Sequence, residues 1–173
     1  MLINGIEMTK AQVRVEVAKD VVRSLKLLKP KCGTYLRPFG TPALANSIVE
    51  SSKDSRKVAQ KLKKGCEVCA LGACFLSTVK LMSKYTFDPI GPAFGLPGKS
   101  ESWDREQLLG KLYKVFTPFQ LDLIETAFER TSCMDVWERG LRATAFGNMY
   151  SDDTQRLRAI MKNIIKNNGT FKP

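Results

Sequence analysis

The sequence predicts a mainly all-α protein, a single compact domain of about six or seven helices over residues 1–173, with a small β element near the N-terminus. Three observations support this fold class. Apolar residues recur at helical spacing in several segments, helix-start signals precede those segments, and no internal repeat or heptad run is present. A chain of 173 residues is long enough to bury one hydrophobic core.

The first long helix is expected to begin after Thr9, a capping residue, and to run to about Leu28. Pro30 would end it, because proline lacks the backbone N–H that a helix interior needs. Residues 1–8 and 34–40 are the segments in which any β structure is expected. The apolar face of this helix would consist of Val13, Val17, Val21, Leu25 and Leu28.

The middle of the chain predicts three further helices and one long loop. A short helix is expected over about residues 41–50, because Pro42 suits the first helical position. A strongly basic helix should cover residues 53–64, and an apolar helix should follow over about residues 65–85. The Pro/Gly-rich segment 87–102 predicts a long loop, and loops of this length are often functional or mobile.

Two helices are expected next, and the second has a specific start signal. One covers about residues 103–115. Thr117, Pro118 and Gln120 then form the pattern of a capping box with proline at the first helical position. The apolar stripe of the second helix would consist of Leu121, Ile124 and Phe128.

The C-terminal part predicts two more helices. Residues 134–148 should form the first, with Trp137 and Leu141 directed inward. The last helix should start near Ser151, where acidic residues favour the N-terminal end of the dipole, and stop at Gly169. Its buried face would consist of Leu157, Ile160, Met161, Ile164 and Ile165.

Composition restricts the chemistry of this chain. It carries 28 Lys+Arg against 17 Asp+Glu, a net charge of +11, and no histidine. The missing histidine excludes Ser-His-Asp and Cys-His catalysis and histidine-ligated zinc. The excess of positive charge favours an anionic partner, such as nucleic acid, a nucleotide or an acidic protein surface, although it also serves solubility. We therefore expect a binding protein without a cofactor rather than an enzyme.

Three cysteines in the predicted apolar helix allow three interpretations. Cys66, Cys69 and Cys74 form a C-x2-C-x4-C pattern, and a zinc site would need a fourth ligand from Cys32 or Cys133. A redox C-x-x-C pair normally opens a helix after a strand, but the segment upstream predicts a lysine-rich helix. The sequence favours the third interpretation, in which these cysteines are small apolar residues of a buried helix.

The segment AFGLPGKS, residues 93–100, comes close to a phosphate-binding P-loop. Ala93 stands where that motif has its first glycine, and no buried strand precedes it. A nucleoside triphosphatase of the P-loop class is therefore not expected. Lys99 and Ser100, just before a predicted helix, still make a weaker candidate site for an anion.

The predicted basic helix carries the strongest candidate for nucleic-acid binding. Its cations recur at spacings of four, four and three residues, and Arg56 and Lys63 flank them. Such a row would add salt-dependent affinity for phosphates, but no aromatic residues alternate with it for base stacking. Lys162 and Lys166 fall in the last turns of the C-terminal helix, where the dipole favours cations. The residues of the basic row are Lys53, Lys57, Lys61 and Lys64.

Two features bear on where the protein acts. The N-terminal segment MLINGIEMTK lacks the pattern of a signal peptide, and no apolar run reaches the roughly 18 residues of a membrane span. The odd number of cysteines, five, leaves at least one without a partner in the chain. Reduced thiols in a cytoplasm are therefore expected.

Three segments resemble those of small helical proteins of bacteriophages and related mobile elements. They are CALGA (residues 69–73), FQLDLIETAFE (residues 119–129) and the tail DDTQRLRAIMKNIIKNNGTFKP (residues 152–173). The resemblance covers about a third of the chain and carries no catalytic residues. It implies an intracellular protein in a bacterial host, acting by binding. The leading hypothesis is an inhibitor of a host or defence protein, and the alternative is a nucleic-acid-binding or nucleotide-sequestering protein with a basic surface.

Overall fold

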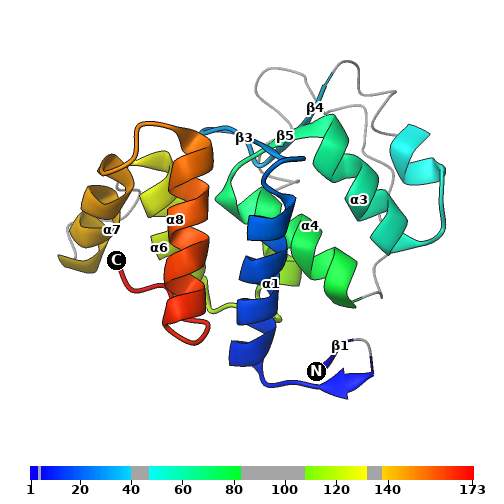
Figure 1. The fold of residues 1–173 in the computed structure, drawn as a ribbon, viewed down its shortest axis with the longest axis horizontal. Coiled ribbons are helices and arrows are strands. Elements are labelled where there is room, and N and C mark those ends of the chain that lie inside the picture. Colours follow the sequence, from blue (N-terminus) through cyan, green and yellow to red (C-terminus); the bar gives the residue numbers. More distant parts are fainter. Residues whose placement is uncertain (4, 40–46, 83–107, 132–137) are drawn as a thin grey trace.

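A computed structural model describes residues 1–3, 5–39, 47–82, 108–131 and 138–173, and these are mainly helical (Figure 1). Shorter helical segments cover residues 47–50 and 108–112. With them the helices number slightly more than the six or seven predicted. The longer helices are α1 (Lys10–Ser24), α3 (Ser55–Gly65), α4 (Ala70–Met82), α6 (Pro118–Glu129), α7 (Glu138–Asn148) and α8 (Asp153–Lys166).

The predicted helix starts are present, with one difference. Thr9 caps α1 in a complete capping box with Gln12, and the Thr117 side chain accepts a hydrogen bond from the Gln120 backbone N–H (3.3 Å). The Gln120 side chain does not complete the second box. It binds the backbone N–H and carbonyl of Phe171 instead (2.7 and 3.4 Å). The start of α6 therefore holds the C-terminal tail in place.

Among the described residues, five short strands accompany the helices, two of them at positions that were not predicted. Strands β1 (Leu2–Ile3) and β2 (Ile6–Glu7) form an N-terminal hairpin. Strand β5 (Cys66–Val68) lies between β3 (Lys29–Pro30), to which it is parallel, and β4 (Leu36–Pro38), to which it is antiparallel. The hairpin and β4 fall in the two segments in which β structure was expected.

The small sheet explains two wrong helix boundaries. Helix α1 ends at Ser24 rather than near Leu28, because the chain must extend to form β3. The apolar helix begins at Ala70 rather than after Gly65, because residues 66–68 form β5. Both strands are very short, and backbone pairing with distant segments outweighs the local helical pattern there.

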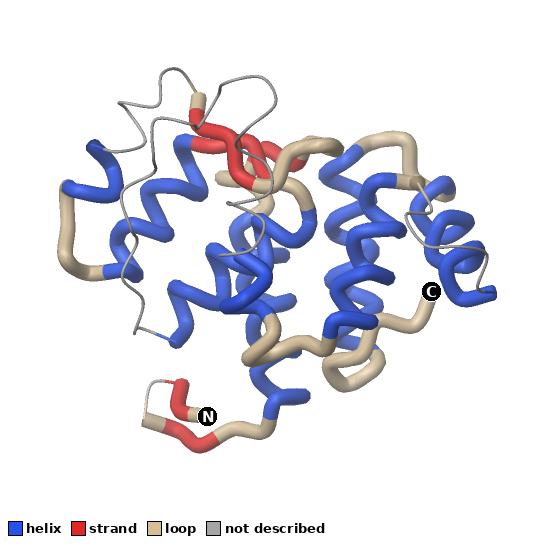
Figure 2. The backbone as a smooth tube through the Cα atoms, turned by 180° about the vertical axis from the view of Figure 1, so that it is seen from behind, coloured by secondary structure: helices blue, strands red, loops and turns tan. Residues whose placement is uncertain are grey.

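Helix α4 is the centre of one hydrophobic core. All its residues from Ala70 to Val79 are buried, as its apolar composition predicts. It packs against α1, α3 and α6, while α1 also packs against α8, and α6 against α7. Seen from either side, α3 and α4 lie towards one end of the molecule and α6 and α7 towards the other (Figures 1 and 2).

The C-terminal helices confirm most, but not all, of the expected burial. In α8 the predicted apolar face is buried, except that Ile165 is only partly so. In α7 the prediction for Leu141 is wrong, because this residue is 57% exposed. Trp137 and the loop 87–102 lie outside the described residues.

Gly147 allows α7 to approach α6 closely. A Cβ atom at this position would lie 1.9 Å from the carbonyl oxygen of Ala127. We therefore expect Gly147→Ala to lower the free energy of unfolding by about 1–3 kcal/mol, because the two helices must separate. Urea unfolding followed by circular dichroism measures this change.

The matched control is Gly110→Ala, at an exposed helical position where an added Cβ meets no atom within 4 Å. This variant should be as stable as the parent or up to about 1 kcal/mol more stable, because alanine is the better helix former. Equal losses in the two variants would contradict the close packing of α7 on α6.

Candidate functional site

One face of α8 is exposed and positively charged. Its cations are Arg158, Lys162 and Lys166, spaced four residues apart, so their Cα atoms lie about 6 Å from one another along the helix. All three are exposed, and none of their side chains forms a hydrogen bond or ion pair in the part of the chain that the structure describes. We call these three residues the α8 cation row.

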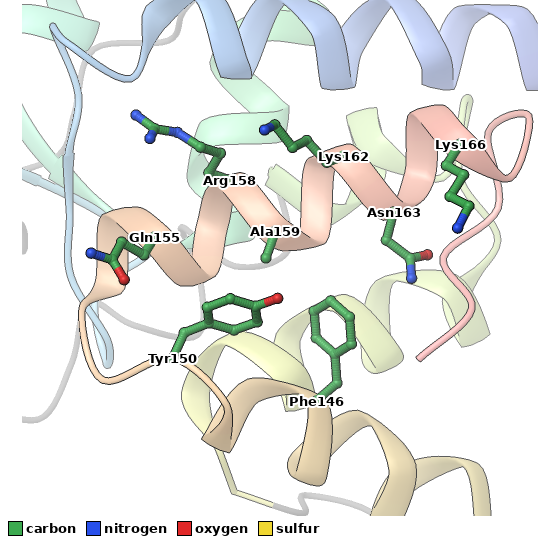
Figure 3. A pocket seen from close by; sticks show the side chains of 8 residues that line it. All are labelled: Phe146, Tyr150, Gln155, Arg158, Ala159, Lys162, Asn163 and Lys166. Atoms are coloured by element: carbon green, nitrogen blue, oxygen red, sulfur yellow. The ribbon is translucent and has the colours of Figure 1, made fainter.

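Beside the α8 cation row lies an open pocket of about 450 Å³, which we call the α7–α8 groove (Figure 3). Phe146 and Tyr150 form its aromatic wall, with their ring centroids 5.8 Å apart. The ring of Phe146 also makes an edge contact, at 5.4 Å, with that of the buried Phe171. The lining residues are Phe146, Tyr150, Gln155, Arg158, Ala159, Lys162, Asn163 and Lys166.

Buried Arg156 fixes the turn that carries the aromatic wall. Its Nε donates to the carbonyl oxygens of Gly147 (3.1 Å) and Tyr150 (3.2 Å), and its Nη2 donates to that of Tyr150 (2.7 Å). Its Nη1 donates to the Phe128 carbonyl (3.1 Å) and to Oδ1 of Asp153 (2.6 Å). The guanidinium thus joins the end of α7 to α6 and α8, and the position of Tyr150 depends on it.

The polar residues of the groove differ in what they can offer a ligand. The Asn163 amide already holds the tail, since it donates to the Lys172 carbonyl (2.7 Å) and accepts from the Lys172 N–H (2.9 Å). The side chain of Gln155 is exposed and makes no hydrogen bond with a described residue. The side chain of Ala159 is small and faces Tyr150 across the groove (Figure 3).

The groove combines two kinds of contact that suit a nucleotide unit. Unpaired cations attract phosphates, and exposed aromatic faces stack on bases. Its volume lies within the roughly 300–1,000 Å³ that is typical of small-molecule sites. The eight lining residues include no carboxylate, thiol or hydroxyl nucleophile other than the phenol of Tyr150. The groove therefore offers a ligand positive charge and aromatic surface.

The basic row predicted from the sequence forms a second, separate surface, which we call the α3 ridge. Its members Lys53, Arg56, Lys57, Lys61 and Lys64 are all exposed. Lys53 precedes the helix, which begins at Ser55, and Lys61 donates to Ser51 Oγ (2.7 Å). No aromatic contact of these cations occurs among the described residues. The role of the ridge in binding an anion stays a prediction.

Lys63, expected to flank the ridge, is instead buried, with 1% of its side chain exposed. Its ammonium donates to Asp20, to Ser24 Oγ (3.1 Å) and to Ser77 Oγ (2.9 Å). Lys80 donates to the other oxygen of the same carboxylate. This polar cluster joins α1, α3 and α4 in the core and takes Lys63 away from any external ligand.

Cys66, Cys69 and Cys74 lie in the core, as the sequence predicts, but only Cys74 is within the apolar helix. Cys66 is in β5, Cys69 directly precedes α4 and Cys74 is within α4, and all three are buried. Cys66 and Cys69 thus stand at a strand-to-helix junction, the position typical of a redox C-x-x-C pair. However, burial raises the pKa of the Cys66 thiol to about 12, whereas a redox pair needs a thiol with a lowered pKa. Burial likewise raises the pKa of Cys74 to about 12.

Some of the predicted metal ligands and anion-binding residues lie within the described part of the chain and others do not. Among the described residues, no group of three or more cysteine or acidic side chains is arranged to hold a metal ion. Cys32 is near Asp153 and Arg156. Cys133, Lys99 and Ser100 lie outside the described residues. No described helix has the length and apolar character of a membrane span.

The α7–α8 groove was not predicted from the sequence. The helix dipole favours cations mainly within the last turn of a helix. It therefore accounts for Lys166, but not for Lys162 or Arg158. Their spacing of four residues, opposite the buried face of α8, was the available signal. No protein-family model matches the chain, and no curated protein or solved structure shows significant similarity to it.

Proposed function

We propose that this protein binds nucleic acid through the α7–α8 groove. The observation that carries the proposal is the α8 cation row, whose three unpaired charges line the same pocket as two aromatic rings. A net charge of +11 would add long-range attraction to a polyanion. The α3 ridge lacks the aromatic component and lies at the other end of the molecule, so we assign it a secondary role.

The test compares two double variants that remove the same charge from the two surfaces. Arg158→Ala/Lys162→Ala changes the α8 cation row, and Lys57→Ala/Lys61→Ala changes the α3 ridge. Binding of a fluorescent single-stranded oligonucleotide is followed by anisotropy over a salt series. If both α8 cations contact phosphates, their removal should flatten the plot of log K against log salt by about 1.4, since each single-strand contact contributes about 0.7.

The α3 double variant should retain nearly the parent slope, and both variants should stay folded, because exposed helical cations lose little on replacement by alanine. If only the α3 double variant flattens the slope, the nucleic-acid site lies on the α3 ridge instead of the α7–α8 groove. If the parent protein binds no oligonucleotide even at low salt, the proposed function is wrong.

A protein partner is the second candidate, and an apolar stripe along α7 and the first residue after it favours this candidate. Leu141, Ala145 and Met149 recur every four residues and are exposed, Leu141 by 57% and Met149 by 72%. An apolar helix face of this kind can dock into a hydrophobic groove on a partner protein. The basic residues around the stripe would then face an acidic rim of that groove. The resemblance to bacteriophage proteins would make this partner a host or defence factor in the bacterial cytoplasm.

A pull-down from bacterial lysate with and without nuclease separates the two candidates. A protein that stays bound after nuclease treatment, and is lost from Leu141→Glu/Met149→Glu, would support a direct protein partner. Loss of every partner on nuclease treatment would support the nucleic-acid proposal.

A further inference from the structure

We infer that the α7–α8 groove receives an unpaired base of a single nucleic-acid strand, stacked on Tyr150, while the α8 cation row contacts the phosphates of that strand. This inference rests on the proposed function and specifies its substrate. The cation row alone would serve any polyanion, whereas the aromatic wall can contact only a base that is not paired and stacked inside a duplex.

The backbone of Tyr150, which carries the stacking ring, is held in place. Its carbonyl accepts two hydrogen bonds from buried Arg156, and its N–H donates to the Gly147 carbonyl (3.2 Å). Phe146, beside it, is fixed against the buried Phe171. The ring of Tyr150 is only partly buried, and its hydroxyl has no partner among the described residues. The backbone of this turn would therefore lose little conformational entropy when a base stacks here.

Ala159 leaves the space that a base would occupy. It lies on α8 between Arg158 and Lys162, and its methyl group faces Tyr150 (Figure 3). A longer side chain at this position would fill the groove without removing any charge. The exposed Gln155 amide, at one end of the groove, offers a donor and an acceptor to the edge of a base.

The length of the α8 cation row favours a strand over a free nucleotide. Arg158 and Lys166 are eight residues apart, which corresponds to about 12 Å along the helix. A row of this length can contact several successive phosphates of a strand, more than the single phosphate group of a nucleoside monophosphate offers. The groove is open rather than enclosed, so a strand can enter it from solvent.

The experiment compares three ligands of equal length: a single-stranded oligonucleotide, the same strand with abasic sites at every position, and a duplex. Stacking contributes about 1–3 kcal/mol per base, which corresponds to roughly a 5- to 150-fold difference in affinity. We expect the parent protein to bind the normal strand at least about fivefold more tightly than the abasic strand.

Two variants test the base contact independently. Tyr150→Leu removes the platform, and Ala159→Leu fills the groove with a good helix former. Both should lower the affinity for the normal strand to that for the abasic strand and leave the salt slope unchanged. Tyr113→Leu, at an exposed tyrosine outside the groove, is the matched control and should change nothing.

The outcomes separate this inference from the proposed function. Equal binding of normal and abasic strands by the parent, or full affinity in both groove variants, would overturn the inference but leave nucleic-acid binding intact. Absence of all oligonucleotide binding would overturn both. A nucleoside monophosphate that binds as tightly as the strand in calorimetry would contradict the assignment of a strand.

Discussion

Replacing Arg156 by methionine should lower the free energy of unfolding by about 3–5 kcal/mol, the usual cost of breaking a buried charge cluster. The Arg156 side chain is 0% exposed and donates to four backbone carbonyl groups and to the Asp153 carboxylate. Methionine keeps a flexible, unbranched side chain, although a shorter one, and donates no hydrogen bond, so these buried acceptors would lose their partner. Urea unfolding at neutral pH measures the loss.

The matched control for this change is Arg158→Met, two residues along the same helix. Arg158 is exposed and unpaired among the described residues, so its replacement should change stability by less than about 0.5 kcal/mol. Arg156→Met should also weaken single-strand binding in whatever fraction remains folded, because Tyr150 loses its anchor. A loss below about 1 kcal/mol for Arg156→Met would show that the guanidinium does not hold this turn.

The second large effect is expected at the polar cluster in the core. Lys63→Met leaves the Asp20 carboxylate, which is 2% exposed, with Lys80 as its remaining cation. It also takes the ammonium donor away from Ser24 and Ser77. We expect a loss of about 3–5 kcal/mol, because a buried charge then lacks its principal partner.

This cluster also predicts a dependence on pH. Burial raises the pKa of Asp20, but the hydrogen bond and charge of Lys63 and the hydrogen bond from Lys80 outweigh it, so the pKa lies below its ordinary value of 3.8. A carboxyl group with a lowered pKa in the folded state stabilises the protein at pH values above its unfolded-state pKa. This contribution is lost as the pH falls through its folded-state pKa. The difference in the free energy of unfolding between the parent and Lys63→Met should therefore be greatest at neutral pH and shrink below about pH 4.

The double variant Asp20→Leu/Lys63→Met serves as the control. It removes both buried charges, so it should lose less than the sum of the two single variants. Strict additivity of the losses, or a Lys63→Met effect that is constant down to pH 3, would contradict a direct interaction between these two groups.

The sequence predicts the helices well where capping and periodicity agree with the tertiary structure. Thr9, Thr117 and the acidic start of α8 cap helices as expected. The predictions fail where distant segments meet. Strands β3 and β5 have only two and three residues, too few for a periodic pattern, and they form because the sheet pairs segments that are far apart in the chain.

The candidate site was harder to predict than the fold because its parts come from three sources. The α8 cation row is visible as a spacing, but the aromatic wall comes from α7 and the following turn, and Phe171 of the tail supports it. Lys63 shows the converse problem. It resembles its exposed neighbours Lys61 and Lys64 in sequence, yet the Asp20 carboxylate that draws it into the core lies 43 residues away.

The most direct test of the central claim is an NMR titration of the ¹⁵N-labelled protein with a short single-stranded oligonucleotide. Binding in the α7–α8 groove predicts that the largest amide shift changes fall within residues 146–166, with Tyr150 and Ala159 among them. Residues of α3 should shift less. Changes confined to residues 53–64, or no changes at saturating oligonucleotide, would contradict the account.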